Sequence, residues 1–180
     1  MASRTTPSAR DMVIALLVLL LPILVISWFF TRVPEPPIQA ADLGPVLARA
    51  EAESPYPVAL PAGLPDGWVC VRARWTPKGE QLLNGDPAPG NSWQLGYLTP
   101  AQMYLGIDQR DAAIPDLIAA TTRAGVADGT SELPGASWQR YLSKDGRTRS
   151  LVSSTSGVTT VVSGDVPYAK LEAFVQTFRR

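Results

Sequence analysis

The sequence predicts an α+β fold in which an N-terminal transmembrane helix is followed by an antiparallel sheet with helices packed on one face. Two observations lead to this prediction. Residues 12–30 form an apolar run without any charge, and a helix of that length crosses the hydrocarbon core of a bilayer. After residue 68, three strand-like segments are followed by a helix-like segment, and then the same order recurs. That order is typical of hairpin-connected strands combined with helices.

The apolar run has the features of an uncleaved signal anchor. Its only polar side chain is Ser27, and it ends in Trp28, Phe29 and Phe30. A cleaved signal peptide, the alternative, has an apolar core of about 7–15 residues followed by a small-x-small site. Here the run is longer, and bulky rings stand where small residues are needed. The absence of a polar face argues against a buried helix of a soluble domain.

The charges beside this run predict its orientation. Arg4, Arg10 and the amino terminus precede it and are opposed only by Asp11, whereas the two charges just after it cancel. The more positive flank of a membrane helix stays in the cytoplasm. We therefore expect residues 1–11 to be a cytoplasmic tail, and the C-terminal part to lie outside the cell membrane in a single-pass topology.

Residues 31–54 are predicted to be a Pro-rich linker and a short helix. Clustered prolines at residues 33–37 favour extended geometry and hence a stiff spacer. Asp42 can cap the helix that follows it. The apolar positions on one face of this helix are Leu43, Val46, Leu47 and Ala50. The remaining residues, 55–180, are enough for one extracytoplasmic α+β domain.

The first half of this domain is predicted to contain three strands and a helix. Residues 68–75 alternate, with Trp75 on the same face as Val69 and with Cys70 on the opposite face. Further strands are expected at residues 92–98 and 103–109. A helix is expected from Pro115 to just before Gly125, since proline suits a first helical position. Residues 129–135 are expected to be a loop.

The second half repeats this order. Strands are predicted at residues 138–142, 149–153 and 158–163, with a tight hairpin turn at residues 144–146. A helix is predicted after Pro167. Its apolar stripe, which we expect to face the core, consists of Tyr168, Leu171, Phe174, Val175 and Phe178. Short matches between the halves, such as Ser-Trp-Gln at residues 92–94 and 137–139, indicate a possible duplicated β-β-β-α unit.

Composition excludes several functions. Histidine is absent, which excludes Ser-His-Asp and Cys-His catalysis and the usual zinc sites. The formal net charge is 0, so the chain lacks the basic footprint of a nucleic-acid-binding protein. Cys70 is the only cysteine and cannot form an intrachain disulfide. We expect a semi-buried thiol there, with an intermolecular disulfide as the alternative.

Three aspartates are the strongest candidates for catalysis. Asp108, Asp111 and Asp116 lie close together in the sequence, around Arg110. Two carboxylates at a suitable separation can hydrolyse glycosides, one as acid and the other as base or nucleophile. In the structural alternative, Asp111 and Asp116 lie near the start of a helix, where capping and the helix dipole favour negative charge. We favour the structural role and retain a carboxylate-dependent envelope hydrolase as the alternative function.

Hydroxyl groups offer a weaker case for catalysis. Ser153, Ser154 and Ser156 lie in a predicted hairpin turn and lack a Gly-x-Ser-x-Gly elbow. Ser143 and Lys144 are adjacent and therefore lack the Ser-x-x-Lys spacing of a nucleophile and base. We expect no nucleophile among them.

Phosphate and metal sites are not indicated either. Gly125, Gly129 and Gly135 lack the strand–loop–helix context of a phosphate-binding loop. The acidic residues show no EF-hand spacing. The sequence therefore predicts no catalytic, cofactor-binding or metal-binding residue, and no cofactor.

Aromatic residues provide the remaining candidates for ligand binding. Trp68, Trp75, Trp93 and Trp138 could form a platform for carbohydrate or lipid. Such residues more often fill the core between a sheet and its helices, and the alternating pattern places Trp75 to do so. We expect a core role for most of them.

The chain resembles a family of actinobacterial single-pass membrane proteins whose extracytoplasmic domain has no assigned function. The likeness covers nearly the whole chain, although each motif is short. Its motifs are Arg10-Asp11-Met12, Leu64-Pro65-Asp66-Gly67-Trp68, Trp93-Gln94-Leu95-Gly96-Tyr97, Thr99-Pro100, Tyr104, Gln109, Gly135, Trp138, Thr160-Val161-Val162-Ser163-Gly164 and Leu171. The resemblance implies an exported, membrane-tethered domain and supplies no site residues.

Taken together, these features predict a membrane-tethered binding, sensing or scaffolding module of the cell envelope rather than an enzyme. The expected partners are the lipid bilayer, through residues 12–30, and an envelope protein, lipid or glycan. No nucleic-acid partner is expected.

Overall fold

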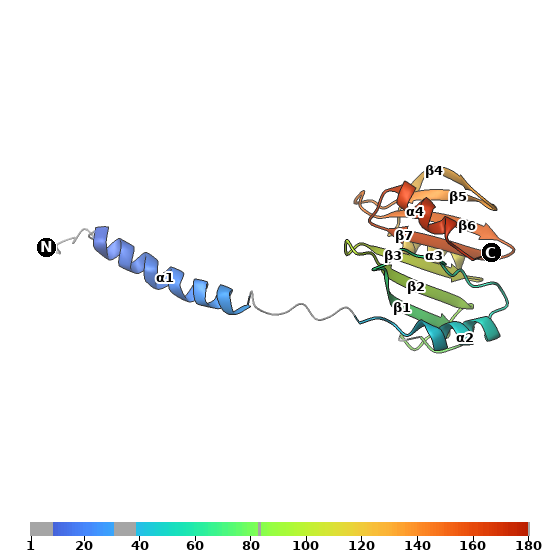
Figure 1. The fold of residues 1–180 in the computed structure, drawn as a ribbon, viewed down its shortest axis with the longest axis horizontal. Helices are drawn as coiled ribbons and strands as arrows, with labels where there is room; N and C mark the ends of the chain where they lie inside the picture. The colour runs from blue at the N-terminus through green and yellow to red at the C-terminus, as the bar shows by residue number, and fades with distance from the viewer. Residues whose placement is uncertain (1–8, 31–38, 83, 180) are drawn as a thin grey trace. The chain divides into compact units, whose positions relative to one another are not determined.

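The computed structural model describes residues 9–30, 39–82 and 84–179 (Figure 1). It divides into two units, Met1–Ile38 and Gln39–Arg180. The first contains α1 (Ala9–Phe30), which is long and apolar enough to cross a membrane. The helix predicted at residues 12–30 is thereby confirmed. The spacer predicted at residues 33–37 lies outside the described residues.

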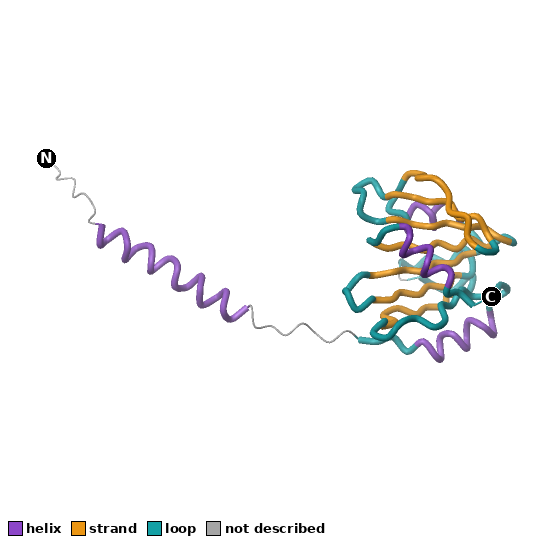
Figure 2. The backbone as a smooth tube through the Cα atoms, turned by 45° about the horizontal axis from the view of Figure 1, so that its top comes forward, coloured by secondary structure: helices purple, strands orange, loops and turns teal. Residues whose placement is uncertain are grey.

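The second unit is built on one seven-stranded antiparallel sheet with the order β1-β2-β3-β7-β6-β5-β4 (Figures 1 and 2). The strands are β1 (Val69–Thr76), β2 (Ser92–Leu98), β3 (Tyr104–Arg110), β4 (Val126–Leu133), β5 (Ala136–Leu142), β6 (Arg149–Thr155) and β7 (Val158–Gly164). The helices are α2 (Leu43–Glu53), α3 (Ile114–Thr121) and α4 (Tyr168–Gln176). The predicted α+β fold is therefore confirmed.

β4 differs from the prediction, which placed a loop at residues 129–135. The strand forms a hairpin with β5 at one edge of the sheet. Most of its side chains are exposed, and Ser131 is its one buried residue. An edge strand that buries so little has no apolar face to produce an alternating pattern.

A bulge in β1 corrects the predicted faces of that strand. The pairing with β2 shifts between Cys70 and Arg72, so one extra residue is accommodated on β1. Cys70 is paired with Tyr97 and packs against the main core, on the same side as Trp75. The prediction that Cys70 faces away from Trp75 is therefore wrong.

The main core lies between one face of the sheet and the helices α2 and α4. Trp93, Leu95 and Ile107 are almost completely buried on the strands, and Leu171 and Phe174 contribute from α4. The apolar stripe predicted for the terminal helix is thereby confirmed as a packing face.

α3 packs against the opposite face, contrary to the prediction that all helices share one face. Its buried Leu117 contacts Val152 and Val161 in a second, smaller core. The main face near β3 is already covered by the segment around Tyr56 and Leu60. The opposite face of the sheet, where Val152 and Val161 are available for packing, is therefore the one that α3 covers.

The sheet order brings the two predicted repeats side by side. The strands β1-β2-β3 are followed across the sheet by β7-β6-β5, so the third strand of each repeat lies at the centre. Trp93 and Trp138 both belong to the main core. The following helices, however, lie on opposite faces. The repeat is present in the strand order and is not maintained in the placement of the helices.

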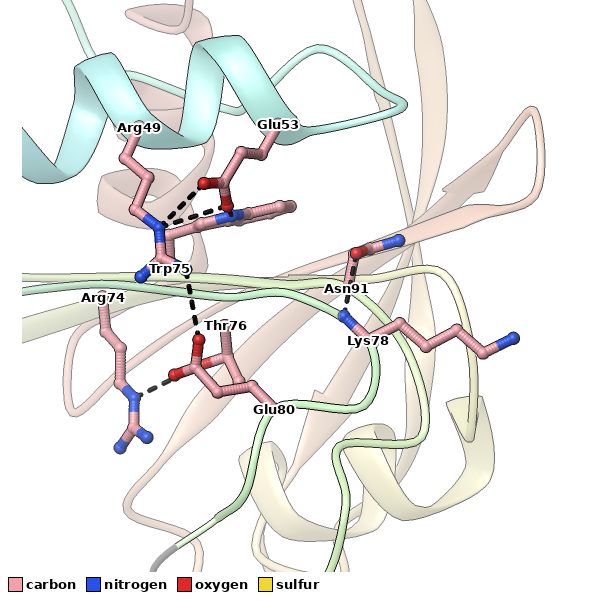
Figure 3. A network of polar contacts seen from close by, with 8 residues as sticks. All are labelled: Arg49, Glu53, Arg74, Trp75, Thr76, Lys78, Glu80 and Asn91. Carbon is pink, nitrogen blue, oxygen red and sulfur yellow. Dashed lines mark hydrogen bonds and ion pairs between the residues drawn. The ribbon is translucent and has the colours of Figure 1, made fainter.

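α2 lies along β1 at one edge of the sheet (Figure 1). Its predicted cap is confirmed, since Asp42 accepts a hydrogen bond from the backbone of Gly44. At its other end, Glu53 accepts a hydrogen bond of 2.9 Å from the indole of Trp75 and pairs with Arg49 (Figure 3). The ion pair is exposed, so the indole contact and the burial of Ala50 are the main links to the sheet.

We predict that the domain loses stability in acid through Glu172 of α4. Hydrogen bonds from Ser131 and Arg140, 2.6 Å each, hold the pKa of Glu172 below its ordinary value. A carboxylate with a lowered folded-state pKa stabilises the fold above its unfolded pKa, and this stabilisation is lost as the pH falls. The melting temperature should therefore decrease below about pH 4.5.

Thermal melts between pH 3 and 7 test this, with E172Q as the matched variant. E172Q should show a shallower acid dependence than the unsubstituted protein. Identical slopes for the two proteins would contradict the prediction.

Candidate functional site

The candidate aspartates have separate structural roles. Asp108 lies on β3 and accepts a hydrogen bond of 2.8 Å from the amide of Gln94 on β2. The carbonyl of Gln94 in turn accepts one of 2.6 Å from Arg72 on β1. Burial raises the pKa of Asp108. The three side chains form a polar row across neighbouring strands.

Asp111 binds a loop instead of joining this row. Its two carboxylate oxygens accept hydrogen bonds from the backbone and side-chain amides of Asn91, at 2.8 and 2.7 Å. Asp116 is exposed in the first turn of α3. Asp108 and Asp111 are therefore held by different partners. Asp111 binds Asn91 and does not cap α3, whose N-cap residue Ala113 makes no side-chain hydrogen bond.

The hydroxyl candidates are also engaged in local structure. Ser143 donates a hydrogen bond to Asp145 and accepts one from the backbone of Thr148, which closes the hairpin predicted at residues 144–146. Ser153 donates to the carbonyl of Ser137. These bonds stabilise turns and strand pairs.

The candidate glycines lie in three different settings. Gly125 follows α3, Gly129 lies within β4, and Gly135 lies in the turn between β4 and β5. They do not form a common loop before a helix. Among the residues that the structure describes, no group of three or more acidic or cysteine side chains is placed to hold a metal ion.

Three of the four candidate tryptophans belong to the core, as expected. Trp75, Trp93 and Trp138 are 4%, 0% and 6% exposed. Trp68 differs, because it is only partly buried and lines a groove at one end of the sheet. This groove is the best candidate binding site in the described part of the chain.

The apolar groove, as we call it, has a volume of about 410 Å³, within the range of roughly 300–1,000 Å³ found for small-molecule sites. Three segments form it: the loop before β1, the β2–β3 turn, and α4 with the residues just before and after it. Its principal apolar side chains are Leu64, Trp68, Pro100, Met103, Ala173 and Phe174.

The β2–β3 turn is shaped by its own hydrogen bonds. The hydroxyl of Thr99 accepts a hydrogen bond of 3.1 Å from the backbone of Met103. Gln102 adopts a positive φ of 58°, which completes the reversal. Pro100 thereby approaches Gly67 so closely that a Cβ atom at Gly67 would lie 2.9 Å from its ring. Glycine at this position permits the contact between two walls of the groove.

Aromatic packing supports the floor of the groove. The ring of Phe174 stacks on Trp68 with centroids 5.5 Å apart, and it meets Tyr97 and Phe178 edge-on at 6.0 and 5.6 Å. Burial raises the pKa of Tyr97 to about 12. The floor is thus an aromatic cluster that is uncharged at neutral pH.

The chemistry of the lining residues suits binding. Lys170 is the only charged residue among the described residues that line the groove, and no carboxylate, serine or cysteine lines it. The arrangement can remove an apolar ligand from water, and it offers no acid–base pair for a reaction.

We predict that Cys70, which packs against the same core, reacts slowly with alkylating reagents. Burial raises the pKa of its thiol, and the thiolate is the reactive form. At pH 8, the alkylation rate of the folded protein should be well below that of the urea-unfolded chain. Equal rates in the two states would contradict this, and a dimer on non-reducing gels would support the alternative of an intermolecular disulfide.

Comparisons with known proteins place the chain in a family. A search of curated proteins finds no match. The family model described as "Protein of unknown function (DUF4245)" matches residues 4–178, which include both α1 and the sheet domain. The chain therefore belongs to the DUF4245 family of proteins of unknown function.

Proposed function

We propose that the protein is a membrane-tethered binding module that engages a component of the cell envelope through the apolar groove. The observation that carries this proposal is the lining of the groove, which is apolar apart from Lys170 and two threonines. The apolar helix α1 supplies the tether. The resemblance to actinobacterial single-pass membrane proteins is consistent with this role.

The proposed topology has a cytoplasmic N-terminus and an extracytoplasmic domain. Arg4 and Arg10 precede the apolar run, with Asp11 the only acidic residue before it. This positive flank favours retention of the N-terminus in the cytoplasm. A groove on the exported domain is then accessible to lipids, glycans and proteins of the envelope.

We predict that protease added to intact spheroplasts removes a C-terminal tag and spares an N-terminal tag. The bilayer protects only the cytoplasmic end of the chain in the proposed topology. The measurement is immunoblotting of both tags before and after digestion, with lysed spheroplasts as the control. Loss of the N-terminal tag alone would contradict the orientation.

Binding through the groove can be tested by photo-crosslinking in the native membrane. A photoreactive benzoylphenylalanine replaces either Ala173, which lines the groove, or Ala169, which is exposed one turn earlier on α4 and does not line it. We expect a covalent adduct at position 173 and little at position 169. Equal or absent adducts at the two positions would argue against the groove as a binding site.

The second candidate function is a carboxylate-dependent envelope hydrolase. The observation that favours it is Asp108, whose pKa is raised by burial, as is common for a general acid. Under this alternative, glycan turnover by the full-length protein would be abolished by D108N. The binding function predicts no turnover and an unchanged groove adduct in this variant.

A further inference from the structure

We infer that the ligand of the apolar groove is an acyl chain of an anionic membrane phospholipid, with Lys170 positioned for the phosphate of its headgroup. This inference rests on the proposed function and specifies its ligand. Three features support it: the hydrogen bonds of the hydroxyl groups in the groove, the position of Lys170, and the short length of chain between the membrane tether and the domain.

The two hydroxyl groups that line the groove already make hydrogen bonds within the fold. The hydroxyl of Thr99 accepts a hydrogen bond from the backbone of Met103, and that of Thr177 donates one of 2.7 Å to the carbonyl of Phe174. A polar ligand that enters the groove loses its hydrogen bonds to water. The groove offers few groups that could take their place, so burial of such a ligand would be unfavourable. A hydrocarbon chain has no such requirement.

Lys170 gives the groove a positive charge. It lies on α4, is exposed, and has no ion-pair partner in the described part of the chain. A long side chain of this kind can place its stem along an apolar surface and its ammonium in water. The apolar groove with Lys170 beside it complements a molecule that has an apolar tail and an anionic headgroup.

The groove lies at the end of the sheet where the described part of this unit begins, near residue 39. The backbone of Ala41 donates a hydrogen bond of 2.8 Å to the carbonyl of Cys70 at the start of β1, and Trp68, two residues earlier, lines the groove. Only residues 31–38 separate α1 from the domain, and eight residues span at most about 29 Å. Bilayer lipid is therefore the apolar ligand most accessible to this site.

The experiment uses the full-length protein, with the photoreactive residue at position 173, in nanodiscs of phosphatidylglycerol or phosphatidylcholine. We expect a lipid adduct by mass spectrometry, with a higher yield from phosphatidylglycerol. K170Q should reduce that yield about fivefold, which corresponds to the ~1 kcal/mol that one lysine contributes near an anionic lipid surface. K144Q, which removes an exposed lysine from a hairpin turn, should leave the yield unchanged.

The possible results separate this inference from the proposed function. A protein or glycan adduct at position 173 in native membranes, without a lipid adduct, would support the proposed function and overturn the lipid assignment. Equal yields from the two lipids, or no effect of K170Q, would overturn the headgroup contact and hence the inference. No preference for position 173 over 169 would overturn both. Melting temperatures of all variants establish that each is folded.

Discussion

Replacing Trp93 with alanine is expected to lower the free energy of unfolding by about 3–5 kcal/mol. Trp93 is completely buried near the start of β2, opposite Trp75 on β1. Its indole N–H donates a hydrogen bond of 2.9 Å to the carbonyl of Ala59. The substitution creates a cavity and removes the donor for this carbonyl. Since small proteins are stable by only about 5–15 kcal/mol, a large share of the total stability would be lost.

Urea denaturation of the full-length protein in mild detergent, followed by circular dichroism, measures this effect. W93F is the first control, because it retains most of the buried volume and should cost less. W68A is the second, because Trp68 is only partly buried and its removal leaves the centre of the core intact. A loss in W93A no greater than that in W68A would contradict the assigned role of Trp93.

The elements that the sequence predicted correctly share strong local signals. The helix at residues 12–30 is apolar except for Ser27, and α4 carries an apolar stripe at helical spacing. The hairpin at residues 144–146 contains Asp-Gly, a characteristic turn pair, and Gly146 adopts the positive φ of 70° that such turns use. In these segments, local preference and tertiary structure agree.

β4 was missed because its stability depends on pairing with β5. Its sequence contains Asp128 and Gly129, which are unfavourable in strands, and it lies at the edge of the sheet. One signal was available. Pro134-Gly135 separates Leu133 from Ala136 by two residues, and such a pair indicates a turn between two strands.

The placement of α3 and the groove could not be predicted from local patterns. An apolar face on a helix shows that the helix packs against other apolar residues. It does not show on which side of the sheet the helix lies. Ala113, in the left-handed conformation with a φ of 49°, directs the chain into α3, and alanine gives no signal for this. The groove combines segments near Leu64, Pro100 and Phe174, whose proximity results only from the complete fold.

Replacing Phe174 with alanine is expected to affect both stability and ligand binding. Phe174 is 3% exposed, and its ring contacts Trp68, Tyr97 and Phe178. Its removal should lower the free energy of unfolding by about 3–5 kcal/mol, as for other buried phenylalanines. Trp68 would also lose the ring on which it stacks, so one wall of the groove would no longer be held in place.

V175A provides the matched control, because Val175 is the next residue of α4, is also buried, and does not line the groove. It should lower the free energy of unfolding less than F174A does and leave the photo-adduct at position 173 unchanged. F174A should reduce the adduct yield at temperatures where both variants are still folded, because the wall formed by Trp68 depends on the ring of Phe174. Equal adduct yields in the two variants would show that binding does not depend on the aromatic floor. The groove would then contribute to binding only through its other lining residues, such as Pro100, Met103 and Ala173.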